Sequence, residues 1–185
     1  MTSQMNLLYL SDTGHILALF TRSAQPAQLE KAPDDFAGSG LHVRGLGDFT
    51  SSAFGTLSDF NNLDVVIPLN RLALSAADVD PIVMMAPRLS YIDSNKQIQP
   101  ATITGQSAAV APPTITITVT AAPSADLAIL VLIDGPSLSA PHPISGKMPA
   151  TQTTTIVNLP ILSTGSYYAL VFIETYSAIV QSFSI

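Results

Sequence analysis

Histidines and paired carboxylates are the side chains in this sequence best suited to hold a metal ion or move a proton. The three histidines are far apart in the chain: His15, His42 and His142. None has a ligand-type neighbour at the spacing that zinc sites use. The acidic pairs, Asp34-Asp35 and Asp78 with Asp80, lack the twelve-residue loop of a calcium site. We therefore predict no catalytic residue, no metal ligand and no cofactor, and we interpret these side chains as parts of turns and solvated loops.

The tripeptide Asp12-Thr13-Gly14 is a further candidate for a catalytic group. It resembles the signature of aspartic proteases, in which two such aspartates share a proton and activate water. The chain has no second copy of the tripeptide, so the resemblance implies a dimeric enzyme, and His15 stands where those enzymes have a small residue. Asp and Gly are also the residues that a tight turn favours. We interpret the segment as a hairpin turn and keep a dimeric aspartic hydrolase using Asp12 as a remote alternative.

The segment Ser145-Gly146-Lys147 ends like a phosphate-binding loop. Such a loop begins with a glycine five residues before its second glycine, and Pro141 occupies that position. No phosphate site is therefore predicted.

Charge is distributed unevenly along the 185 residues. Of the twenty Lys, Arg, Asp and Glu residues, only four lie in residues 97–185: Asp126, Asp134, Lys147 and Glu174. Charge usually keeps folded surfaces apart, so this half of the chain has a surface suited to being covered by other subunits. The net charge is −6 and the basic residues are scattered, which argues against nucleic-acid binding.

The apolar residues do not predict a membrane protein. No apolar stretch reaches the roughly 18–20 residues that a membrane span needs. The N-terminus lacks the basic region of a secretion signal, so we expect synthesis in the cytoplasm and incorporation into a particle, with the final location open. The chain has no cysteine, which excludes disulfides and thiol chemistry.

The pattern of apolar and turn residues predicts an all-β chain in two parts. Residues 1–107 are expected to form an N-terminal β region with long irregular loops. In it, residues 5–21 make a β-hairpin and residues 23–62 a long arm rich in Gly and Pro. Both strands of the hairpin are apolar on both faces, which predicts cover on both sides. Shorter strands are expected at Asp64–Leu69, Leu72–Leu74, Ile82–Met85, Leu89–Ile92 and Gln97–Thr104, with one helical turn over residues 76–80.

Residues 111–185 show the clearest strand pattern, after an expected linker at Ala108–Pro113. Thr114–Thr120 alternates Thr with Ile and Val, which predicts a half-buried strand; no charge interrupts it, so it could offer an edge to a neighbour's strand. Leu127–Ile133 is apolar throughout, as in a central strand. Further strands are predicted at Gln152–Leu159, Tyr167–Glu174 and Ile179–Ile185, and turns over Pro136–Pro149.

The last three of these strands resemble the end of a fibronectin type III or related immunoglobulin-like sandwich. Leu159-Pro160 closes one strand, and Tyr167 or Tyr168 opens the next, where the family uses a tyrosine hydroxyl to cap the corner. The resemblance implies a C-terminal immunoglobulin-like β-sandwich over residues 111–185. Because the chain has no Trp and leaves only residues 135–152 for the middle strands, a shortened or rearranged sandwich is implied.

These observations favour a structural role over chemistry. The leading hypothesis is a subunit of a large assembly of the capsid, sheath, tail or filament type, whose partners are copies of itself, with other assembly subunits left open. The alternative is an adhesin or a carbohydrate- or protein-binding module working through its loops.

Overall fold

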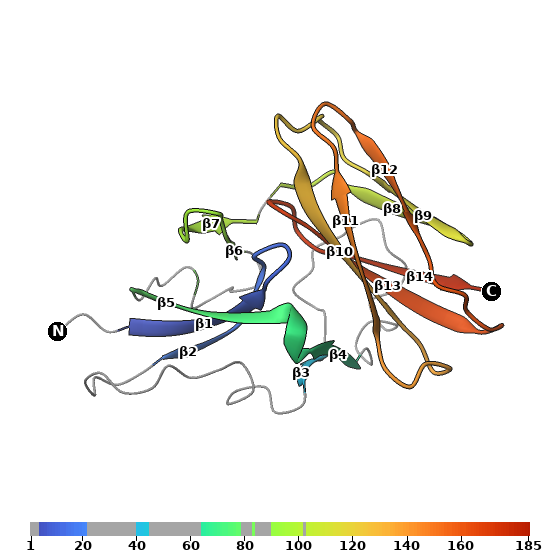
Figure 1. Ribbon diagram of the computed structural model, residues 1–185, viewed down its shortest axis with the longest axis horizontal. Coiled ribbons are helices and arrows are strands. Elements are labelled where there is room, and N and C mark those ends of the chain that lie inside the picture. Colours follow the sequence, from blue (N-terminus) through green and yellow to red (C-terminus); the bar gives the residue numbers. More distant parts are fainter. Residues whose placement is uncertain (1–3, 22–39, 45–63, 79–82, 84–89, 102) are drawn as a thin grey trace.

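The computed structural model describes residues 4–21, 40–44, 64–78, 83, 90–101 and 103–185 (Figure 1). The chain is all-β, as the sequence predicts. The N-terminal part contains β1 (Gln4–Leu10), β2 (Ile16–Thr21), β3 (Gly40–Arg44), β4 (Asp64–Pro68), a 3-10 turn η2 (Leu69–Arg71), β5 (Leu72–Asp78), β6 (Ser90–Ile92) and β7 (Ile98–Pro100). The C-terminal part contains β8 (Ser107–Ala111), β9 (Thr114–Thr118), β10 (Leu127–Asp134), β11 (His142–Met148), β12 (Thr154–Asn158), β13 (Ser166–Ile173) and β14 (Ile179–Ser184).

The seven C-terminal strands form two antiparallel sheets that face each other. One has the strand order β11-β10-β13-β14 and the other β12-β9-β8. Alternate residues of β9 point into the space between them, so that Ile115 and Ile117 are fully buried against Val131 and Val171 of the other sheet. At one corner of this core the hydroxyl of Tyr167 donates a 2.8 Å hydrogen bond to the carbonyl of Ser163.

The N-terminal strands cover the outer face of the four-stranded sheet. The sheet β2-β1-β5 supplies Leu8 and Leu72, which share a buried cluster with Leu130, Leu132 and Phe172 of the C-terminal sheet. Figure 1 shows these N-terminal strands on one side of β10 and β13, with the β12-β9-β8 sheet on the other. Strand β10 is therefore buried on both faces, which is why Leu127–Ile133 contains no polar residue.

The hairpin of β1 and β2 is also covered on both faces, as predicted. The side chains of Leu8 and Leu10 point to the C-terminal sheet, whereas those of Met5, Leu7 and Ile16 enter a second cluster. In that cluster they contact Val83 and Ile92.

Some expectations for single segments are wrong. Strand β3 lies inside the expected irregular arm of residues 23–62 and pairs with β4. The rest of that arm, and the expected strand Ile82–Met85 apart from Val83, lie outside the described residues. Residues 108–111 of the expected linker belong to strand β8, which pairs with β9 over its whole length. The first three residues of the expected helical turn, Ala76–Asp78, belong to strand β5 and pair with the start of β1. The proline-rich stretch before Pro149 contains β11 rather than only turns, since each of its residues from His142 to Met148 pairs with β10.

Candidate functional site

The tripeptide Asp12-Thr13-Gly14 lies in the turn between β1 and β2. The turn closes with hydrogen bonds from Gly14 N–H to the Leu10 carbonyl (2.8 Å) and from Leu10 N–H to the His15 carbonyl (2.9 Å). Gly14 has φ of +75°, and a β-carbon built there would lie 2.1 Å from the carbonyl oxygen of Ile92 in β6. Glycine is thus required by both the backbone conformation and the close approach of β6.

The carboxylate of Asp12 is bound within the fold. Its Oδ1 accepts hydrogen bonds from the Arg71 guanidinium at 2.9 Å and from the hydroxyl of Ser145 at 3.0 Å. The same guanidinium nitrogen donates to the Ser145 hydroxyl at 2.8 Å. Because Ser145 belongs to β11, this group of three side chains joins the N-terminal hairpin to the edge of the C-terminal sheet. The geometry gives Asp12 a stabilising role that needs no catalysis.

His15 is buried beside this turn, with 1% of its surface exposed. Its Nε2 lies 2.7 Å from the carbonyl of Tyr176, and its Nδ1 lies 2.9 Å from the hydroxyl of Thr13. A carbonyl only accepts, so Nε2 carries the proton and Nδ1 accepts from Thr13. The ring also packs edge-on against Phe172, with centroids 5.2 Å apart. Burial lowers the pKa of His15 to about 4, against interactions with the backbone of Tyr176 and of Thr13, which raise it.

Apart from Ser145, which binds Asp12, the other described candidate side chains do not gather around His15 or Asp12. His142 is exposed at the start of β11, and Ser145-Gly146-Lys147 lies inside that strand instead of in a loop before a helix. Asp78 is exposed at the end of β5. The side chains that fall outside the described residues are Asp34, Asp35 and Asp80, and for His42 only the backbone of β3 is described.

Among the described residues, no group of three or more His, Asp or Glu side chains is placed to hold a metal ion. None of the helical segments among them is long and apolar enough to cross a membrane.

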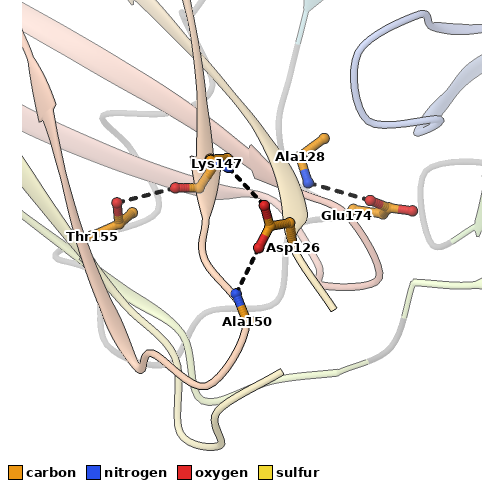
Figure 2. A network of polar contacts seen from close by, with 6 residues as sticks. All are labelled: Asp126, Ala128, Lys147, Ala150, Thr155 and Glu174. Carbon is orange, nitrogen blue, oxygen red and sulfur yellow. Dashed lines mark hydrogen bonds and ion pairs between the residues drawn. The ribbon is translucent and has the colours of Figure 1, made fainter. Parts of the chain in front are cut away.

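The four charged residues of the C-terminal half are engaged in local contacts, and Figure 2 shows Asp126, Lys147 and Glu174 with their partners. Lys147 donates a 2.7 Å hydrogen bond to Asp126, which also accepts the N–H of Ala150 at 2.8 Å. The contact with Lys147, followed by that with Ala150, holds the pKa of Asp126 below its usual value. Glu174 accepts the N–H of Ala128 at 3.3 Å, and Asp134 accepts the N–H of Gly135 at 2.8 Å.

The outer face of the sheet β12-β9-β8 has no charged side chain. Strand register places its residues in three rows that cross the sheet. The rows are Thr154, Thr118 and Ser107; then Ile156, Thr116 and Ala109; then Asn158, Thr114 and Ala111. All nine side chains are exposed or half-buried, and all are neutral. We call this surface the neutral face.

The position of Thr114–Thr118 corrects one expectation from the sequence. Strand β9 is the central strand of its sheet, since β12 and β8 pair with its two sides, so it offers no edge to a neighbour. The Thr side chains alternate outward as predicted, but the strands at the edges are β12 and β8. Ile156 of β12 is 64% exposed, and Ile161 beyond the strand is fully exposed. The sequence alone does not reveal Ile156, because an exposed Ile in a β-strand cannot be told from a buried one by its residue type.

Comparisons with protein-family models, with curated proteins and with solved structures find no match for this chain.

Proposed function

We propose that this protein is a structural subunit of a large assembly, of the capsid, sheath, tail or filament type, built through contacts between β-rich surfaces. The observation that carries the proposal is the neutral face, where three strands contribute nine uncharged side chains. A strand with one solvated face normally alternates buried apolar residues with polar residues on the solvated face, and charges among the latter keep copies apart. A face of uncharged and mostly small side chains instead permits another surface to approach closely.

The charge distribution supports the same proposal. Asp126 and Lys147 pair with each other, and Glu174 binds a backbone N–H, so these charges are already engaged within the subunit. The chain as a whole carries a net charge of −6, which opposes association wherever like charges meet. Contact through the neutral face avoids this repulsion.

We also propose that the seven C-terminal strands belong to the immunoglobulin-like class, of which the fibronectin type III module is one form. Support comes from the division into sheets of three and four strands and from the Tyr167 hydroxyl, which caps the corner before β13. The sequence left Tyr167 and Tyr168 as alternatives for the tyrosine that caps this corner, and in this proposal the capping residue is Tyr167.

The test is the particle mass in solution, measured by light scattering over a range of concentrations, with electron micrographs of the same sample. Large regular particles would support the proposal, whereas a monomer of 19.4 kDa at every concentration would refute it. Thr116→Lys places a charge at the centre of the neutral face and should reduce assembly. Ser124→Lys adds the same charge in an exposed turn outside that face and serves as the matched control.

A further inference from the structure

Strand β12 has one unpaired edge. It ends the order β12-β9-β8, and within the described residues no ladder joins it to β11. The flanking hydrogen bonds, from Leu159 N–H to the Pro113 carbonyl and from Val119 N–H to the Thr153 carbonyl, are both 2.8 Å long. They show that odd-numbered residues of β12 direct their backbone groups to β9. In an antiparallel strand the alternate residues direct theirs the other way, so Ile156 offers a donor and an acceptor at the free edge.

The free edge of β12 lacks the devices that normally prevent strand pairing. The outer edge of the opposite sheet is β11, which contains Pro143 and the exposed Lys147. Proline and lysine are common blocks at such edges. Strand β12 contains neither, and its central residue is the 64% exposed Ile156. The other edge of the same sheet, β8, exposes only small side chains such as Ala109.

We infer that β12 pairs antiparallel with β12 of a second copy of this chain, across a two-fold axis near Ile156. The inference rests on the proposed function and names the contact through which assembly starts. A partner for this edge must be an extended, uncharged strand with an apolar centre, because any charge there would lose its hydration without finding a counter-charge. Strand β12 itself meets these requirements, and a two-fold axis lets the same surface serve both subunits.

The pairing has a defined geometry. With Ile156 on the axis, each Ile156 lies opposite its counterpart, and Thr154 of one copy lies opposite Asn158 of the other. The two sheets of three strands become one sheet of six, and the neutral faces of both copies become continuous. A paired strand of five residues buries less than the roughly 1,200 Å² typical of stable complexes, so the pair alone should be weak and depend on concentration.

Disulfide trapping tests this geometry, because the chain has no cysteine of its own. In the proposed dimer the two Cα atoms at position 156 are about 5.5 Å apart, within the range of a disulfide. The experiment uses full-length Ile156→Cys and, as matched control, Thr116→Cys, which lies beside Ile156 on the same face but one strand further from the axis. Both are oxidised under mild conditions and run on a non-reducing gel. Thermal melting of each reduced variant checks that it is folded.

The expected result is a covalent dimer in the Ile156→Cys sample at roughly tenfold or greater excess over Thr116→Cys, because only the former brings two thiols within bonding distance. If wild-type protein assembles but Ile156→Cys gives no dimer, the β12 pairing is wrong and the proposed function stands. Equal cross-linking of both variants, or more at Thr116, indicates packing of face against face and also overturns the pairing. If the wild-type chain stays monomeric at all concentrations, the proposed function fails as well.

Discussion

The imidazole of His15 donates a 2.7 Å hydrogen bond to the backbone carbonyl of Tyr176, 161 residues later in the chain. His15 follows the N-terminal hairpin turn, and Tyr176 lies in the turn between β13 and β14. A second polar contact, between Asp12 and Ser145, joins the same hairpin to β11 at 3.0 Å. The N-terminal strands are thus fixed to the C-terminal sheet by directed bonds as well as by apolar packing.

His15 should make the stability of the fold depend on pH. Its pKa is about 4 when folded and 6.5 when free, so between these values the unfolded chain binds a proton that the native protein does not. The contribution of His15 to the free energy of unfolding is fully present above pH 6.5, is lost as the pH falls towards 4, and does not change below pH 4. The difference in this free energy between the two ends of the range is about 3 kcal/mol.

Urea unfolding of the wild type and of His15→Gln between pH 4 and pH 7 measures this effect. We expect His15→Gln to be less stable at pH 7, because it loses buried contacts, but to lose less stability as the pH falls. His142→Gln changes a histidine whose side chain is exposed and should follow the wild type. Parallel pH profiles for the wild type and His15→Gln would contradict the prediction.

Gly14→Ala should severely destabilise the protein. The new β-carbon would lie 2.1 Å from a backbone oxygen of Ile92, and alanine strongly disfavours φ of +75°. We expect a loss of more than about 3 kcal/mol, seen as poor folded yield or a large drop in the melting temperature. At Gly146 the added β-carbon would meet a methyl group of Val157 at 3.2 Å and the β-carbon of Ile129 at 3.9 Å, so Gly146→Ala should cost much less. A Gly14→Ala variant as stable as Gly146→Ala would show that the turn can rearrange.

The sequence predicts the strands that have a clear apolar pattern. Thr114–Thr120 is predicted because its alternation is strict, and β9 covers Thr114–Thr118 of it; Leu127–Ile133 is predicted because it is apolar on both faces. It did not predict β8 and β11, since Ala, Ser, Gly and Pro in these edge strands also favour turns. The apolar pattern of β10 predicts burial on both sides, but it cannot say that the N-terminal strands provide one of the two layers.

The candidate surface was predicted only in part. The neutral character of the C-terminal half is visible in the sequence, and so is the outward alternation of Thr114, Thr116 and Thr118. Which strand forms the edge depends on pairing between residues far apart in the chain, such as Thr154 with Thr118. The partners of Asp12 could not be predicted for the same reason, because Arg71 and Ser145 reach it only in the folded chain.

The ion pair of Asp12 and Arg71 should contribute modestly to stability. The side chains are 17% and 26% exposed, so water screens the charges only in part. A double-mutant cycle with Asp12→Asn and Arg71→Met should give a coupling energy of about 0.5–1 kcal/mol that decreases with added salt. Additive effects would show that the pair is not coupled. The same Asp12→Asn protein tests the remote alternative of a dimeric hydrolase, because any hydrolytic activity that depends on Asp12 should disappear in this variant.

Tyr167→Phe should lower stability by about 1–2 kcal/mol, because the carbonyl of Ser163 loses its donor in a partly buried corner. The ring of Tyr167 and its stacking on Phe183, with centroids 5.6 Å apart, are kept in this variant. Chemical denaturation measures the change. Tyr168→Phe alters the next residue, on the opposite face of β13, and should have a smaller effect. Equal losses of stability in the two variants would show that the Tyr167 hydroxyl has no special role.

Separation of the chain tests whether its two parts fold independently, as the sequence suggested for residues 111–185. A fragment of residues 103–185 contains all seven strands of both C-terminal sheets but exposes the face that the N-terminal strands cover. That face carries four large side chains: Leu130, Leu132, Leu170 and Phe172. At roughly 1.5–3 kcal/mol for burial of each, the free energy gained by covering these four side chains is about 6–12 kcal/mol, comparable with the whole stability of a typical domain.

We therefore expect the fragment to bind a hydrophobic dye and to aggregate on gel filtration. Replacing the three leucines with Thr, which suits an exposed strand face, should restore a soluble fragment. A soluble, monomeric wild-type fragment with the melting temperature of the full chain would show instead that the C-terminal strands need no cover.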